Sequence, residues 1–232
     1  MPRRAFASLV ILCALAGPLA HADDGWKEAG KSDGIAIFNR QRPGSDIAEV
    51  KAIGVIDAPP WIVKNVIDDV GRYKEFMPYT KASDILKKEP AAVVSYQRID
   101  APLVDNRDYT IRIRDESRRL ADGRVVYKNH WVPAEGIGPK PIEGVVRVNI
   151  NEGYWLLEDE DGGKRTRATY YVYTDPGGSL PSFIVNAANT NAIPDLFKAV
   201  SKASKDARYR KERPKLPLAD DTRPAPAVTS PK

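Results

Sequence analysis

Apolar and polar residues alternate with a period of two through most of the middle of the chain, which is typical of β-strands with one buried face. The pattern begins as a hairpin of residues 35–42 and 47–56, with Pro43-Gly44-Ser45 as the turn. Turn residues then separate seven further strand-like runs, at 80–87, 91–100, 107–114, 124–132, 143–150, 154–159 and 165–174. The chain therefore predicts a large antiparallel sheet.

Two helical segments complete this pattern. The first follows Pro59-Pro60, where proline is tolerated in the first turn, and should end at Gly71. From 181 to 204 the pattern is helical again, and Pro194 should kink or split this second helix. A curved antiparallel sheet that covers one face with a single long helix predicts an α+β fold, in which the sheet wraps around the C-terminal helix.

The first 22 residues have the features of an export signal. The pair Arg3-Arg4 precedes an apolar stretch, and Ala20-His21-Ala22 fits an A-x-A cleavage site. We expect cleavage after Ala22 and a periplasmic or secreted protein, while the choice between Sec and twin-arginine export stays open. Cleavage would remove Cys13, the only cysteine, so the mature domain must be stable without a disulfide.

The positive net charge of +5 is concentrated at the C-terminal end. Residues 205–232 hold eight basic and four acidic residues, whereas residues 23–204 hold 26 basic and 27 acidic ones. A nearly neutral domain gives no support for a nucleic-acid partner. We interpret 23–204 as one domain and 205–232 as a basic, proline-rich disordered tail. Transient contact of this tail with an anionic membrane surface is the alternative.

The faces of the central strands mix aromatic and polar side chains with aliphatic ones. A close-packed core would be aliphatic, so the mixture indicates a ligand pocket between the sheet and the helix. The pattern does not decide which face of strand 124–132, with Trp131, points inward. The candidate ligand-binding residues are Val94, Tyr96, Arg98, Arg107, Tyr109, Ile111, Ile113, Trp131, Arg147, Tyr171, Asn186, Asn189 and Thr190.

Arg107 has two interpretations, because it falls on the apolar face of its strand, where an unpaired guanidinium is costly. It could form a buried ion pair, or hydrogen bonds to backbone carbonyls that fix the start of the strand. It could instead have a functional role, either as a catalytic group or as the polar end of the pocket. We favour the structural role for Arg107 and for Arg147, and we expect Arg98 to be the better candidate for contact with a ligand head group.

Three segments in order resemble the StAR-related lipid-transfer (START) domain family, and the resemblance covers about residues 26–204. They are Asn106-Arg107-Asp108-Tyr109, Gly144-Val145-Val146-Arg147 and the run 169–181, TYYVYTDPGGSLP. The resemblance implies a helix-grip fold, with an internal hydrophobic cavity that holds one lipid-like molecule beneath the C-terminal helix.

Steroid-binding members of this family carry an acid–arginine pair deep in the cavity. Ungapped counting places these positions at Val94 and Ile113, which are both apolar here. The departure argues against a steroid recognised by that pair. It favours an acyl chain or a polycyclic hydrocarbon skeleton.

Catalytic signals are weak. His130, the only histidine after the export signal, should point outward if its neighbour Trp131 points inward. There is no G-x-S-x-G motif and no cluster with metal-ligand spacing. We therefore expect a non-enzymatic, monomeric protein that binds or transfers a lipid and needs no cofactor. The alternative is a cyclase- or isomerase-like enzyme that acts on an apolar cyclic substrate in the same cavity.

Overall fold

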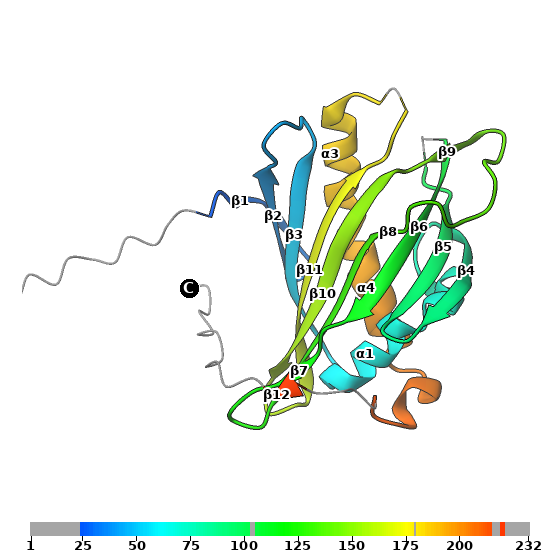
Figure 1. Cartoon of the computed structure of the whole chain (residues 1–232). Coiled ribbons are helices and arrows are strands. Elements are labelled where there is room, and N and C mark those ends of the chain that lie inside the picture. Colours follow the sequence, from blue (N-terminus) through cyan, green and yellow to red (C-terminus); the bar gives the residue numbers. More distant parts are fainter. Residues whose placement is uncertain (1–23, 103–104, 179, 215–218, 221–232) are drawn as a thin grey trace, which may run out of the picture.

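A curved, mainly antiparallel sheet wraps around the C-terminal helices in the computed structural model of the chain (Figure 1). The structure describes residues 24–102, 105–178, 180–214 and 219–220. The strands run in the order β1-β2-β3-β11-β10-β8-β6-β5-β4, so the N-terminal hairpin lies beside the last long strand. This topology confirms the predicted α+β arrangement. The export signal predicted for residues 1–22 lies outside the described residues.

The strands are β1 (Lys27–Ser32), β2 (Ile35–Gln41), β3 (Ala48–Ile56), β4 (Thr80–Glu89), β5 (Ala92–Ile99), β6 (Asn106–Asp115), β7 (Arg118–Arg119), β8 (Val125–Pro133), β9 (Val145–Arg147), β10 (Ile150–Glu160), β11 (Arg165–Asp175) and β12 (Ala219–Asp220). The helices are α1 (Pro60–Asp68), α2 (Tyr73–Phe76), α3 (Ser182–Asn191) and α4 (Ile193–Ala203), with short 3-10 turns η1 (Val70–Arg72) and η2 (Ala207–Arg210).

The sequence pattern missed the short and polar strands. The edge strand β1 is largely exposed and has no apolar alternation, and β7 and β12 each contain two residues. The strand predicted at 143–150 is shorter in the structure, where only the three residues of β9 are a strand. They pair in parallel with the start of β6. Ile150 belongs instead to β10.

The predicted break in the C-terminal helix is confirmed. Pro194 lies in the first turn of α4, where its missing N–H leaves no hydrogen bond unmade. The ring of Phe197 in α4 packs against β3 at Gly54, where an added Cβ would lie only 3.0 Å from that ring. Phe197 also meets Trp155 of β10, with 5.2 Å between ring centroids. No helix within the described part of the chain is both long and apolar enough to cross a bilayer.

The folded chain continues past Ser204, where the sequence analysis placed the end of the domain. Tyr209 of η2 is only 6% exposed, and its hydroxyl donates a 3.0 Å hydrogen bond to Asp69 at the end of α1. The side chain of Asn65 donates to the carbonyls of Tyr209 and Glu212. The basic composition of this segment concealed the apolar contact that fixes its first part, so the boundary at Ser204 is wrong.

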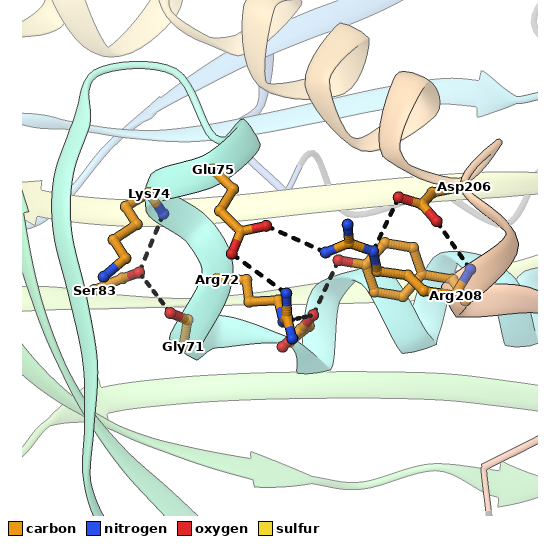
Figure 2. Close-up of polar contacts among 9 residues, drawn as sticks. Gly71, Arg72, Lys74, Glu75, Ser83, Asp206 and Arg208 are labelled. Atoms are coloured by element: carbon orange, nitrogen blue, oxygen red, sulfur yellow. Dashed lines mark hydrogen bonds and ion pairs between the residues drawn. The ribbon is translucent and has the colours of Figure 1, made fainter.

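A polar network holds the same C-terminal segment against η1 and α2 (Figure 2). Arg208 contacts Glu75 at 3.2 Å, and Glu75 is also 3.4 Å from Arg72. On the other side, the hydroxyl of Ser83 in β4 accepts from the backbone of Lys74 and donates to the carbonyl of Gly71. These contacts fix the short α2 segment, whose Tyr73 faces the interior of the protein.

Candidate functional site

An inner pocket of about 140 Å³ lies between the sheet, α2 and α4. Its walls combine aromatic rings, side-chain amides and aliphatic groups. They are formed by Tyr73, Met77, Pro78, Thr80, Gln97, Ile99, Tyr109, Ile111, Ile113, Asn129, Trp131, Asn151, Trp155, Tyr170 and Leu196.

Hydrogen bonds between neighbouring strands fix the polar groups of this inner pocket. The hydroxyl of Tyr109 in β6 donates to Gln97 of β5 at 2.9 Å, and these two residues are direct cross-strand partners. The indole N–H of Trp131 donates to Asn151 at 2.8 Å. Tyr170 packs on the Trp155 ring, with 4.8 Å between centroids. The walls therefore combine polar groups that are hydrogen-bonded to one another with packed aromatic rings.

An outer pocket of about 410 Å³ lies beneath α3 and shares Ile99 and Tyr109 with the inner one. Its lining is predominantly apolar. The residues are Tyr79, Ile99, Ala101, Pro102, Arg107, Tyr109, Val148, Thr174, Pro176, Leu180, Ile184, Val185, Ala188, Asn191 and Ala192. Among these described residues Arg107 is the only charged one.

Arg107 stabilises the start of β6, which agrees with the structural role favoured from the sequence. Its Nη1 donates to the backbone carbonyl of Asp105. Its Nε is buried and has no hydrogen-bond partner. No ion pair in the described part of the chain joins Arg107 to a carboxylate. Of its two structural interpretations, the contact with a backbone carbonyl is therefore the one that the structure contains.

The structure places five candidate residues on the pocket walls and corrects the face assigned to three others. The five are Arg107, Tyr109, Ile111, Ile113 and Trp131. The assignment of Val94, Tyr96 and Arg98 to the same face is wrong. In the observed register, the partners of the inward β6 residues are Val93, Ser95, Gln97 and Ile99.

The error is one residue of register, which turns every side chain of a strand to the opposite face. Val93, not Val94, is the cross-strand partner of Ile113. Since Val93 is also apolar, the conclusion that an apolar pair replaces the acid–arginine pair still holds at this place. Arg98 lies on the outer face, so the prediction that it contacts a ligand head group is not supported.

Arg147 belongs to a cluster on the outer face of the sheet. Its guanidinium contacts both carboxylate oxygens of Asp108, at 2.5 and 3.1 Å, and Tyr96 donates to the same carboxylate at 3.0 Å. Burial, and then the bond to Asp108, raises the pKa of Tyr96 to about 12. The structural role predicted for Arg147 is confirmed, and neither Arg147 nor Tyr96 lines the inner or the outer pocket.

Tyr171 also lies on the outer face, where its hydroxyl donates to Glu49 at 2.9 Å and its ring stacks on Tyr154 at 5.1 Å. Its neighbour Tyr170 is the residue that reaches the inner pocket. Because Tyr170 and Tyr171 are adjacent and of the same type, the sequence pattern could not show which of them points into the pocket.

The candidate residues on α3 do not line either pocket with the side chains that the structure describes. Asn186 accepts a 3.0 Å hydrogen bond from the backbone of Ala48 and donates to the carbonyl of Asp46, which ties α3 to the hairpin. The hydroxyl of Thr190 donates to the carbonyl of Asn186 within the helix. The side chain of Asn189 lies outside the described residues. Other residues of α3, such as Ala188, line the outer pocket.

A charged network lies behind the wall of the inner pocket. The amide of Asn129 donates to Asp68 at 3.0 Å. Lys64, whose side chain is only 1% exposed, pairs with Asp68 and lies 2.5 Å from Asp115. Burial raises the pKa of Asp68, with Lys64 opposing this effect. Five further wall residues are not among the candidates predicted from the sequence: Asn129, Asn151, Gln97, Tyr73 and Tyr170. The register in which Gln97 lies opposite Tyr109 would have identified Gln97.

Acid–base and metal chemistry have few candidates near the pockets. His130 is a half-buried residue on the outward face of β8, as predicted, and burial lowers its pKa. The described residues contain no group of three histidine, cysteine or acidic side chains that could hold a metal ion. Burial raises the pKa of Tyr109 to about 12, and it raises those of Tyr73 and Tyr170 as well.

A curved sheet that grips a broken C-terminal helix, with pockets between them, defines the helix-grip class. The chain belongs to the START domain family, whose model matches residues 12–210. The phosphatidylcholine transfer protein of Rattus norvegicus is 27% identical over 82% of this chain and 96% of its own. The crystal structure of a STAR-related lipid transfer protein from Xanthomonas axonopodis is 26% identical, with a TM-score of 0.69, and covers 79% of this chain and 100% of its own. Human STARD10 has the same fold, with 21% identity and a TM-score of 0.66 over 82% of this chain and 77% of its own.

Proposed function

We propose that this protein binds one lipid-like molecule in a cavity formed by the inner and outer pockets, and carries it between membranes without chemical change. The observation that carries the proposal is the apolar outer pocket beneath α3, which meets the inner pocket at Ile99 and Tyr109. Each methylene that leaves water gains about 0.8 kcal/mol, so a hydrocarbon chain favours such a space over solution. The names of the rat and Xanthomonas relatives agree with this function.

The protonation of the pocket tyrosines favours binding over catalysis. A general base works best with a pKa near the operating pH. Tyr73, Tyr109 and Tyr170 all have pKa values raised by burial, so they stay protonated at neutral pH. In that form they are poorly suited to accept a proton from a substrate, and the hydroxyls of Tyr73 and Tyr109 already donate to the carbonyl of Ile67 and to Gln97.

The break between α3 and α4 supports a route for ligand exchange. At Ala192, between the two helices, the chain can bend without breaking a regular helical ladder, because Pro194 donates no backbone hydrogen bond. The hydroxyl of Tyr79 donates to Asp195 in the first turn of α4 at 3.2 Å, and the side-chain amide of Asn186 ties the middle of α3 to the hairpin. We infer that α3 moves as a lid when these contacts open.

Replacing Ala188 by tryptophan should block the outer pocket and abolish most lipid uptake. Ala188 lines this pocket, and an overpacked site of this kind costs about 1–3 kcal/mol, so we expect about a 5- to 100-fold loss of binding. The measurement is uptake of a fluorescent fatty acid and of a fluorescent phosphatidylcholine from vesicles.

The matched control is Ala187→Trp, one residue along the same exposed helix and outside both pockets. It should retain uptake, and both variants should have thermal unfolding close to that of the unmodified protein. Uptake by the folded Ala188→Trp variant at the unmodified level would contradict the proposed cavity.

We also propose that the protein acts after export, with residues 1–22 removed. The support is the pair Arg3-Arg4, the apolar stretch and the A-x-A site that ends at Ala22. N-terminal sequencing of the protein from a periplasmic fraction should give a chain that starts at Asp23. Recovery of a chain that retains Met1 from the cytoplasm alone would overturn this part of the proposal.

A further inference from the structure

The guanidinium of Arg107 is an incompletely satisfied cation in the wall of an apolar pocket. Arginine carries five N–H donors, and the structure gives one contact, from Nη1 to the carbonyl of Asp105. The Nε donor is buried without an acceptor. Buried donors in folded proteins are almost always hydrogen-bonded, so an unsatisfied one beside a pocket requires an explanation.

No acid of the described chain neutralises this cation. Asp108 is the next residue, but the alternation of β6 turns it to the outer face, where Arg147 contacts both of its oxygens. Asp105 offers its backbone carbonyl to Arg107, and no ion pair links its carboxylate to that guanidinium. The side chains that the structure describes therefore include no negative partner for Arg107.

The side chains around Arg107 indicate what kind of molecule its negative partner would belong to. Ile99 faces it across the β5–β6 ladder, and Val148 and Ile184 belong to the same pocket wall. Such a lining suits hydrocarbon. A carboxylate or a phosphate presents two oxygens in the spacing that a guanidinium recognises. The pocket volume of about 410 Å³ falls in the lower part of the range of sites that hold one small molecule, which favours one chain over two.

We propose that Arg107 selects an acidic amphiphile: a carboxylate or phosphate head group on a single hydrocarbon chain, with the chain in the outer pocket under α3. This inference rests on the proposed function and narrows its ligand to one class. The role goes beyond support of the strand start, because the contact of Nη1 with Asp105 leaves Nε free to donate to the head group.

The test compares ligands that share one chain and differ in the head group. Palmitic acid supplies a carboxylate, palmitoyl lysophosphatidic acid a phosphate, and hexadecanol neither; all three are titrated against a bound neutral fluorescent probe. Since a hydrogen bond to a charged group is worth more than a neutral one, we expect the unmodified protein to bind an acid about 10- to 100-fold more tightly than hexadecanol. Inorganic phosphate alone should not displace the probe.

Variants of β6 assign the preference to Arg107. Arg107→Gln should bring the ratio of acid to alcohol affinity to about one while hexadecanol binding is retained, and Arg107→Lys should keep part of the preference. Arg114→Gln makes the same change at an exposed position of the same strand and should leave the ratio unaltered.

The outcomes separate this inference from the proposed function. If hexadecanol and both acids bind the unmodified protein equally, or if Arg107→Gln keeps the full preference, the role of Arg107 is overturned while lipid binding stands. If none of the three chain compounds binds, and the protein takes up neither the neutral probe nor phosphatidylcholine, the proposed function fails with it. Displacement by inorganic phosphate would identify a site for a free anion instead of a lipid head group. If Arg107→Gln does not fold, Arg107→Lys supplies the assignment: a ratio of acid to alcohol affinity that it leaves fully unchanged would overturn the role of the guanidinium.

Discussion

Replacing Asp108 with asparagine should lower the free energy of unfolding by about 3 kcal/mol, within the range found when one partner of a buried ion pair is removed. The Asp108 side chain is 2% exposed, and its carboxylate receives two contacts from Arg147 and one from Tyr96. Asparagine keeps the shape and one acceptor oxygen. The Arg147 guanidinium, which is 30% exposed, would lose its counter-charge and part of its hydrogen bonding.

The measurement is urea unfolding at neutral pH, with Asp100→Asn as the control. Asp100 pairs with Lys81 at 3.2 Å, but both side chains are about half exposed, so this variant should change stability by no more than about 0.5 kcal/mol. Equal losses in the two variants would show that the Asp108 cluster is no stronger than a surface pair. A loss below about 1 kcal/mol in Asp108→Asn would lead to the same conclusion.

The fold was predictable because its signals are local. Alternation of apolar residues gives the strands, and Pro194 marks the helix break, since a proline cannot donate the backbone hydrogen bond that the helix interior needs. The inward face of β6, with Tyr109 and Ile113, followed from the same alternation. Local signals also identified the polar residue, Arg107, on that face.

The rest of the site depends on contacts between segments that lie far apart in the sequence. Gln97 lies opposite Tyr109 in the register of β5 against β6, and a shift of one residue exchanges Gln97 for Arg98 on the pocket wall. Asn186 looked like a pocket residue because it lies on the polar side of its helix. Its amide instead bonds to the backbone at Asp46 and Ala48, a contact that no spacing in the sequence reveals.

The partner of Arg147 illustrates the same limit. Arg107 and Asp108 are adjacent in the sequence, yet in β6 their side chains point to opposite faces of the sheet. Asp108 is then free to bind Arg147, 39 residues away in the chain. Among the residues that the structure describes, Arg107 has no carboxylate partner, and this separation is the physical basis for the ligand contact proposed for it.

Replacing Lys64 with methionine should lower the free energy of unfolding by about 2–3 kcal/mol at neutral pH, below the full value for a buried pair because its partners are partly solvated. Lys64 is 1% exposed and contacts both Asp68 and Asp115, whose side chains are 39% and 30% exposed. Methionine fills the same space without the charge. The two carboxylates would then face each other unneutralised, next to Asn129 in the wall of the inner pocket.

The pH dependence of this loss distinguishes charge from packing. Burial already raises the pKa of Asp68 above 3.8, while Lys64 lowers it. A carboxyl group whose pKa is higher in the folded than in the unfolded state stabilises the fold at a pH below its unfolded pKa. This stabilisation is lost as the pH rises through the folded-state pKa. Without Lys64 that pKa rises further, so the deficit of Lys64→Met should be largest near pH 7 and should shrink at about pH 4.5.

Urea unfolding of both proteins at the two pH values measures this difference. Lys81→Met, which removes the exposed lysine of the pair with Asp100, is the matched control and should change stability little at either pH. A deficit of Lys64→Met that is equal at both pH values would mean that the lysine acts through packing of its hydrocarbon stem. Asp68 also accepts the hydrogen bond from the amide of Asn129 in the pocket wall. If Lys64 acts through its charge, lipid uptake by Lys64→Met should therefore be reduced at neutral pH, together with its stability, and should recover on acidification.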